Sequence, residues 1–429
     1  MKKAFSRLLV FLLVCSFGAG AARADEITDW TRQLYDSALV ANTSPLVITR
    51  SAAIMQASVF DAVNGIERKY TPIHVEPNAP AGASRRAAAV QAAYAILVKV
   101  YPAQVSALNN KRTTSLNGIA SGEAAEHSTS INDGLEWGQT VADAIWALRA
   151  TDGFTTVFPP FVGGNAPGQW RPTPPGNLPG AGVQFATMTP WVMASPSQFL
   201  PAGPPALSSA DYLADFNEVK LMGRVDSFAR NAEQTLYASF WALSSANFFW
   251  NQVAIALAEE RHLTFSEKSR LFAALNLAMA DAAIGCWNAK QTFVFWRPVT
   301  AIPLAAGDGN PFTLEDPLWT PLITTPNHPE YLSGHSCISG AGGRVLALRF
   351  GDHSQFQVAS DHPSLAGVVR VFSSFSSALE EVKNARIFGG IHFRTACDEG
   401  QELGIAVADH VLANALLPVH GQQLGHLNE

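Results

Sequence analysis

Two basic residues stand at the end of a long apolar stretch. Lys290 ends the run 266–290, whose apolar residues recur at helical spacing, and Arg297-Pro298 follows after a segment rich in aromatic residues. Only 15% of the chain is charged, and burying lysine or arginine among aromatic side chains is costly without an anionic partner. The pair therefore favours an anion site, although on its own it also fits a lysine that reaches the surface and an exposed arginine.

A second segment has the features of a helix start that binds an anion. Residues 327–332 lead into Ser333-Gly334-His335, and residues 338–350 are apolar and rich in alanine and glycine. A capping serine, a glycine that allows close approach and free N–H groups at a helix N-terminus together attract negative charge. His335 would project from this first turn, within reach of the bound group. An ordinary serine cap followed by an exposed histidine has the same sequence pattern.

A third segment combines Arg386 with His392 across Gly389-Gly390. On a continuous helix the two side chains would lie near one face, provided that the glycines permit a distortion. His392 has apolar neighbours on both sides and is expected to be buried, as a satisfied core histidine would also be.

In this order, the three segments resemble a known signature. The vanadium-dependent haloperoxidases share a pattern with the related phosphatases of the type 2 phosphatidic acid phosphatase (PAP2) superfamily. This pattern is Lys-x6-Arg-Pro, then Ser-Gly-His, then Arg-x5-His. The similarity extends through residues 280–282 and Trp287, and the amino-terminal half resembles the soluble bacterial haloperoxidase-like branch. The resemblance implies a mainly α fold, a large helical bundle of the vanadium haloperoxidase and acid phosphatase type with a long Pro/Gly-rich loop.

The resemblance also implies roles for the residues of the site. Vanadate, or phosphate as a competing occupant, would be held by three cations and by hydrogen bonds from the helix start. These oxyanion-binding residues are Lys290, Arg297, Ser333, Gly334 and Arg386.

The histidines have separate roles in the resembling family. His392 would be the axial ligand of the metal or the nucleophile, and His335 the acid–base group on the opposite side. Trp287 and His328 correspond to residues that flank the metal pocket in peroxidases. His328 equally fits a turn residue beside Pro329.

Three positions depart from the usual pattern: Leu332 replaces a proline, Ala385 a serine and Ala396 an aspartate. Neither of the first two removes a group that would touch the anion. The missing aspartate leaves open what orients His392, and Asp398 or a backbone carbonyl is the candidate.

Two chemistries suit such a pocket. With vanadate bound, hydrogen peroxide and a halide would be the substrates of a haloperoxidase, which is the favoured hypothesis. Without vanadate, His392 would attack a phosphate monoester and His335 would protonate the leaving alcohol, as in an acid phosphatase. A third hypothesis is a non-catalytic exported helical protein with a structural ion-pair network, which would lack enough carboxylates. No Cys-x2-Cys or His-x3-His spacing is present, so neither zinc nor haem is expected.

Three cysteines follow the predicted signal peptide: Cys286, Cys337 and Cys397. If the two histidines face each other across one anion, the backbones near Cys337 and Cys397 must approach. A disulfide between these two would tie the catalytic segments together and leave Cys286 free. Three buried thiols that merely pack are the alternative.

The first residues predict export. Three basic residues precede the apolar run 8–17, and Ala22-Arg23-Ala24 offers a small-residue cleavage site. Cleavage near Ala24 predicts a periplasmic or secreted protein. Four of the 29 basic residues lie in 1–24, which leaves 25 against 35 acidic residues. This acidic balance disfavours nucleic acid and anionic membranes as partners. No stretch after residue 24 is expected to be long and apolar enough to cross a membrane, so no membrane span is expected in the mature chain.

The elements that must position the site are predominantly helical. Between residues 151 and 205 the chain has twelve prolines and eight glycines, which exclude regular structure throughout, and interleaved aromatic residues favour a packed cover. The predicted organisation is a signal peptide (1–24), an amino-terminal helical half (25–150), a covering loop (151–206) and a carboxy-terminal helical half with the site (207–429). Nothing in the sequence specifies the halide, the organic substrate or the oligomeric state. Helical periodicity is found at 46–66, 84–101, 133–149, 207–222, 231–261 and 266–290.

Overall fold

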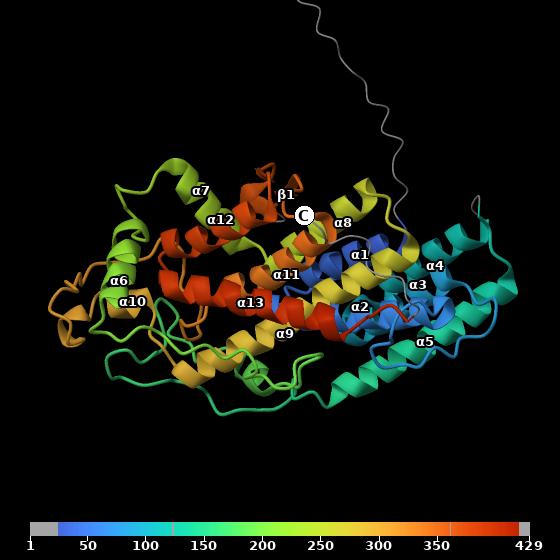
Figure 1. Cartoon of the computed structure of the whole chain (residues 1–429), viewed down its shortest axis with the longest axis horizontal. Coiled ribbons are helices and arrows are strands. Elements are labelled where there is room, and N and C mark those ends of the chain that lie inside the picture. Colours follow the sequence, from blue (N-terminus) through green and yellow to red (C-terminus); the bar gives the residue numbers. More distant parts are fainter. Residues whose placement is uncertain (1–24, 122–123, 361, 420–429) are drawn as a thin grey trace, which may run out of the picture.

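The structure is a computed structural model that describes residues 25–121, 124–360 and 362–419. The predicted signal peptide lies outside the described residues. Helices dominate the described part, and its named strands form a single two-stranded hairpin (Figure 1). The predicted mainly α fold is confirmed.

In the amino-terminal half, glycines allow the backbones of neighbouring helices to come into direct contact. In α5 a Cβ on Gly134 would lie 2.4 Å from the Ser84 carbonyl oxygen, and one on Gly138 would lie 2.4 Å from that of Ala88. Only glycine therefore lets α5 approach α3 this closely. The elements of this half are α1 (Glu26–Val40), α2 (Pro45–Glu67), α3 (Arg85–Val100), η1 (Pro102–Gln104), α4 (Val105–Ser121) and α5 (Ser128–Ala150).

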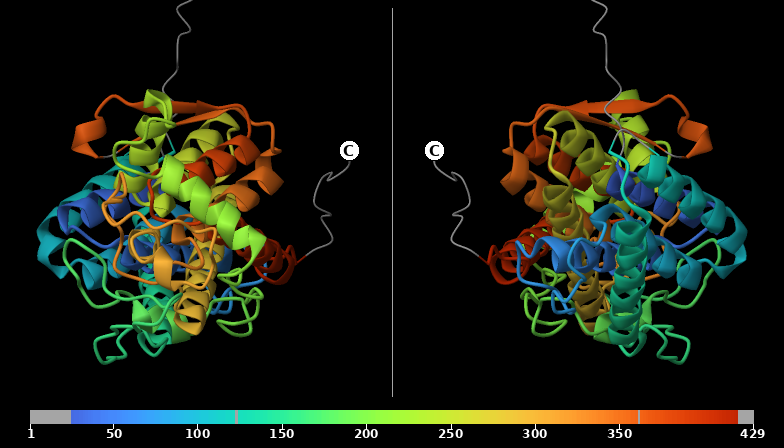
Figure 2. Two further views of the ribbon diagram at one scale, coloured as in Figure 1. Left: turned by 90° about the vertical axis from the view of Figure 1, so that its left-hand side faces the viewer. Right: turned by 90° about the vertical axis from the view of Figure 1, so that its right-hand side faces the viewer.

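The carboxy-terminal half contains the elements that carry the predicted site. Its hairpin pairs β1 with β2 in antiparallel register, with Phe356 opposite Phe372, and lies along the top of both views in Figure 2. The predicted helix 231–261 is interrupted at Ser244-Ser245, where two helices meet. The elements are α6 (Ala210–Met222), α7 (Ala232–Leu243), α8 (Ala246–Glu260), α9 (Phe265–Phe293), α10 (Pro298–Ala301), η3 (Ala305–Gly307), α11 (Gly334–Phe350), β1 (Phe356–Ala359), η4 (Pro363–Leu365), β2 (Val369–Phe372), α12 (Phe375–Phe388) and α13 (Arg394–Asn414).

Helix α9 is the central element and joins the two halves. Thr264 and Glu267 form a capping box at its start, and most of its residues are buried because α2 packs on one side and α11 and α13 on the other. α11 and α13 lie close together, since a Cβ on Gly404 would be 2.2 Å from the Cys337 carbonyl oxygen. The ends of these three helices therefore bring distant parts of the sequence into one place.

Two helices, α2 and α9, are long and apolar enough to cross a membrane by length and composition alone. The expectation that no stretch after the signal peptide would be so was wrong. Both are core helices in the described part of the chain, with 83% and 94% of their most apolar windows buried. Burial against other helices accounts for their composition.

The covering segment, residues 151–206, has η2 (Val183–Thr187) as its one helical turn. It runs along the lower side of the molecule in Figure 1, beneath α9. The Asp281 carboxylate of α9 accepts hydrogen bonds from the backbone N–H groups of Trp191, Val192 and Met193 at 2.6, 2.8 and 3.0 Å. This fully buried acid therefore anchors the covering segment to the central helix.

Candidate active site

Lys290 lies in the last turn of α9 with its ammonium fully buried. The ammonium donates to the carbonyl oxygens of Pro329 and Glu330 at 2.8 and 3.0 Å, and also to that of Leu332. Burial lowers the pKa of Lys290 to about 8. All three donors of the lysine thus hold the turn that leads into Ser333, in addition to placing a positive charge there.

Arg297 precedes α10 and is held from several directions. Its Nε donates to the His328 carbonyl at 2.9 Å, and its Nη1 to the Ile391 carbonyl at 2.7 Å. Nη1 also lies 3.0 Å from Nε2 of His392, and Nη2 lies 2.8 Å from Nδ1 of His328. Burial lowers the pKa of Arg297 to about 10. The guanidinium therefore connects three of the predicted site segments.

Ser333 caps α11, as its sequence predicts. Its hydroxyl oxygen accepts hydrogen bonds from the Ser336 N–H at 3.4 Å and the Ser336 hydroxyl at 3.0 Å, which leaves its own proton free to donate. Gly334 follows against the Trp287 ring, where a Cβ would lie 3.2 Å from the ring carbons. The first N–H groups of a helix have no partner within it, so this turn provides donors for an anion.

Arg386 and His392 are not on one helix, contrary to the sequence interpretation. α12 ends at Phe388, and the chain turns through Gly389 and Gly390, whose φ of 77° favours glycine, before α13 begins at Arg394. The turn brings His392 back beside Arg297. Arg386 donates from Nη1 to the Trp241 carbonyl at 3.4 Å, its Nε has no partner, and burial lowers its pKa to about 10.

His392 is oriented by Glu330, which the sequence interpretation missed. Nδ1 of His392 lies 2.9 Å from Oε1 of Glu330, and the same oxygen accepts the Phe393 N–H at 2.9 Å. An arginine only donates, so Nε2 of His392 must accept from Arg297 and the proton must lie on Nδ1. Asp398 instead pairs with Lys383 at 2.8 Å.

Glu330 therefore supplies the carboxylate that position 396 lacks. Burial raises its pKa to about 8, against the lowering effect of Arg297 and Lys290. Oε1 is an acceptor in either charge state, because a proton on the carboxyl can lie on Oε2. An acidic residue three positions before Ser-Gly-His, in a segment otherwise expected to be buried, was the available sequence signal.

His335 lies on the first turn of α11 and is half-buried. Its Nε2 is a buried nitrogen without a hydrogen-bond partner. Burial first, and then the charge of Arg386, lower the pKa of His335 well below its ordinary value, although backbone hydrogen bonds at Ser244 and Trp241 act the other way. Both His335 and Arg386 therefore contact the backbone of Trp241.

Trp287 and His328 lie beside the cationic cluster. Their ring centres are 5.0 Å apart, and the Lys290 ammonium is 5.5 Å from the centre of the Trp287 ring. The indole Nε1 donates to the Ala181 carbonyl of the covering segment at 3.2 Å. Trp287 thus forms a wall between the cluster and the covering segment.

The charges of this cluster fit an oxyanion. Lys290, Arg297 and Arg386 are all buried. In the described part of the chain, Glu330 is the one carboxyl group that clearly raises the pKa values of Lys290 and Arg297. No carboxyl group in that part has such an effect on Arg386. Buried cations in excess are costly unless an anion joins them, and the unpaired Arg386 Nε and His335 Nε2 are left for such a group. The fold and site together define a helical-bundle protein with a buried cationic cluster that fits an oxyanion.

Comparisons with known proteins support the resemblance to the vanadium haloperoxidases. The family model for the second helical-bundle domain of VCPO matches residues 270–421. The vanadium chloroperoxidase of Curvularia inaequalis is 32% identical over 181 residues, which span 34% of this chain and 29% of that protein. The first bacterial vanadium-dependent iodoperoxidase structure is similar with a TM-score of 0.78 and 26% identity, covering 91% of this chain and 97% of that one.

A bacterial vanadium-dependent chloroperoxidase in its holo form has the same fold, with a TM-score of 0.67 and 18% identity over 86% of this chain and 92% of that one. Residues 270–421 thus match the second helical-bundle domain of VCPO, and the fold of the chain is similar to that of the vanadium haloperoxidases.

The predicted disulfide between Cys337 and Cys397 is wrong, because Cys286, Cys337 and Cys397 are all free and buried. The Cys337 thiol contacts that of Cys286, whereas the Cys397 thiol faces the hydroxyls of Ser333 and Ser336. Burial raises the pKa of Cys397 to about 12, so this thiol stays protonated and slow to react.

We therefore expect three reactive thiols when residues 25–429 are denatured without reductant and titrated with a thiol reagent. The same protein kept folded is expected to react slowly, because none of the three thiols is accessible. A count of one reactive thiol after denaturation would instead support the predicted disulfide between Cys337 and Cys397.

Proposed function

We propose that the protein is a vanadate-dependent haloperoxidase that uses hydrogen peroxide to oxidise a halide. The observation that carries the proposal is the neutral Nε2 of His392, directed among buried cations by Arg297 and Glu330. The similarity to vanadium-dependent iodoperoxidase and chloroperoxidase supports it further.

Each residue of the site has a task in this proposal. Vanadate, when bound, supplies the Lewis-acidic centre at which peroxide is activated toward halide. Arg297 and Arg386 would neutralise its charge, and the Ser333 hydroxyl and Gly334 N–H would donate to its oxygens. The neutral Nε2 of His392 would hold the metal. Lys290 adds positive charge and fixes the turn before Ser333 through its carbonyl contacts.

His335 is proposed to move the proton that the reaction requires. Its half-buried ring carries an unpartnered Nε2, and its lowered pKa keeps the ring neutral, so that it can accept a proton from peroxide. Trp287 and His328 are proposed to line the path of the small substrates.

An acid phosphatase remains the second candidate. The Nδ1–H tautomer held by Glu330 would make Nε2 of His392 a nucleophile toward a phosphate monoester, with His335 as the general acid. Phosphate would occupy the same place as vanadate and compete with it.

The deciding experiment is halide oxidation by chelator-treated protein with and without added vanadate. We expect iodide or bromide oxidation by hydrogen peroxide only after vanadate is added, and loss of that activity when phosphate competes. Hydrolysis of a phosphate monoester that vanadate inhibits, without halide oxidation, would instead establish the phosphatase.

Export is part of the proposal. Helix α1 begins at Glu26, and the Asp25 carboxylate caps it by accepting the N–H groups of Ile27 and Thr28 at 3.1 Å. Cleavage near Ala24 would leave this cap intact, which favours a mature periplasmic or secreted protein. N-terminal sequencing of the exported protein tests the cleavage position.

A further inference from the structure

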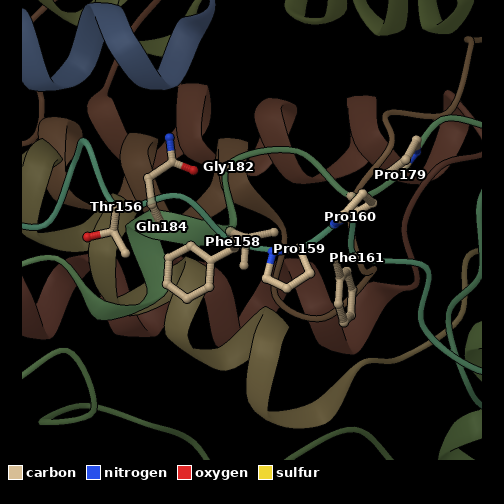
Figure 3. Close-up of a pocket in the computed structure, with 10 residues that line it drawn as sticks. Thr156, Phe158, Pro159, Pro160, Phe161, Pro179, Gly182 and Gln184 are labelled. Atoms are coloured by element: carbon tan, nitrogen blue, oxygen red, sulfur yellow. The ribbon is translucent and has the colours of Figure 1, made fainter.

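A cavity of about 280 Å³ opens in the covering segment. Its lining comes from two stretches, residues 156–161 and 179–184, which face each other across it (Figure 3). At this size it lies near the lower end of small-molecule sites, which run from about 300 to 1,000 Å³. One or two aromatic rings fill such a volume.

The floor of the cavity is attached to the oxyanion site. Ala181 accepts the Trp287 indole N–H at 3.2 Å and donates its own N–H to the Asn327 carbonyl at 2.8 Å. The Asn327 side chain donates to the Pro179 carbonyl at 2.8 Å. Gly182 lies so close to Trp287 that a Cβ would be 2.8 Å from the indole nitrogen. A single tryptophan thus separates the cavity floor from the cationic cluster.

The lining determines which ligands suit the cavity. None of its residues is charged, so a halide, a carboxylate or a phosphate ester would find no counter-ion there. Phe158 and Phe161 offer aromatic surface, and Phe161 is held flat against Trp170 with ring centres 5.3 Å apart and planes within 4°. Thr156 and Gln184 add hydrogen-bonding groups. This composition suits a neutral aromatic ring that carries a hydroxyl or amide.

We propose that this cavity binds the organic acceptor of the haloperoxidase, an electron-rich neutral arene of one or two rings; the inference rests on the proposed function. Hypohalous acid formed from halide and peroxide leaves the oxyanion site past Trp287 and meets the ring in the cavity. The ring carbon forms a bond to the halogen, the oxygen–halogen bond breaks, and the ring proton leaves with the hydroxide as water. Carbon is oxidised by two electrons, and the halogen is reduced from +1 to −1.

The test combines binding with catalysis and uses 2-naphthol as the probe on the full-length vanadate-loaded protein. Binding is measured calorimetrically without peroxide, and halogenation is measured against naphthol concentration. Phe158→Ala removes the half-exposed ring, and Val183→Phe fills the cavity. Phe312→Ala, at a phenylalanine that is 70% exposed and outside the cavity, is the matched control.

We expect saturable naphthol binding that weakens about five- to tenfold in Phe158→Ala and Val183→Phe and is unchanged in Phe312→Ala. The ratio of naphthol halogenation to iodide oxidation should fall in the two cavity variants by a similar factor. Halogenation that rises linearly with naphthol, with no measurable binding and no effect of the cavity variants, would overturn the proposal.

Failure of the proposed function is distinguishable. Absence of iodide oxidation in the vanadate-loaded wild-type protein would refute the haloperoxidase assignment and, with it, the acceptor role. Naphthol binding that Phe158→Ala weakens would still establish the cavity as an arene site.

Discussion

Replacing His392 by alanine is expected to abolish vanadate retention. Lys290, Arg297 and Arg386 carry only donors. Two ring nitrogens lie against Arg297, Nε2 of His392 at 3.0 Å and Nδ1 of His328 at 2.8 Å, and of the two rings that of His392 is the one oriented by a buried carboxyl group. Replacing a residue that only orients a metal ligand typically lowers metal affinity by about 10- to 100-fold. We therefore expect removal of the ligand itself to lower vanadate affinity by more than about 100-fold.

Retention is measured as the vanadium content of protein loaded with vanadate and then passed through a desalting column. His353→Ala, at an exposed histidine, is the matched control and should retain vanadium as the wild type does. Thermal unfolding of both variants shows whether the fold is intact. Unchanged vanadium content in a folded His392→Ala protein would move the metal-binding role to another residue.

Glu330→Ala is expected to have the second-largest effect. The carboxyl group accepts Nδ1–H of His392 at 2.9 Å. Without it, only the contact with Arg297 keeps the proton from moving to Nε2, the atom proposed to bind vanadate. We expect vanadate affinity to fall by about 10- to 100-fold. Glu330→Gln should retain more affinity than Glu330→Ala, because the amide oxygen still accepts the same proton.

Nitrogen NMR of the His392 ring in vanadate-free protein separates positioning from simple loss of stability. The wild type and Glu330→Gln should show the proton on Nδ1, and Glu330→Ala a mixture of tautomers. Asp398→Ala is the control, because Asp398 pairs with Lys383 and does not contact His392. A wild-type tautomer with full vanadate affinity in Glu330→Ala would remove Glu330 from the site.

The site was predictable as a set of residues but not as a set of contacts. The ordered signature selects the residues that the structure brings together, since Arg297 meets both His328 and His392. Which carboxylate orients His392 depends on how residues 329–332 fold back over α9. The three carbonyl contacts of Lys290 belong to that same turn, and local pattern carries no information about it.

The helices differed in how clearly the sequence marks them. α2 and α9 are buried on nearly all sides, so long and nearly continuous apolar runs mark them in the sequence. α4 buries only Leu108 and Ile119, which leaves almost no hydrophobic stripe to detect. The break between α7 and α8 falls at two serines that a continuous helix could also have contained. The first of these elements packs against α3 in the amino-terminal half. The second miss lies at the site, because the backbone at Trp241 and Ser244 contacts His335.

The attachments of the covering segment have a consequence for protein engineering. Asp281 binds it through three backbone N–H groups, and Trp287 and Asn327 hold it through the backbone of Ala181 and Pro179. Hydrogen bonds to backbone N–H and C=O groups do not depend on which side chain the residue carries. The side chains at 156–161 and 183–184 can therefore be exchanged for a different acceptor without changing what fastens the segment in place. The side chains that line the cavity can in this sense be redesigned while the main-chain attachments of the covering segment stay the same.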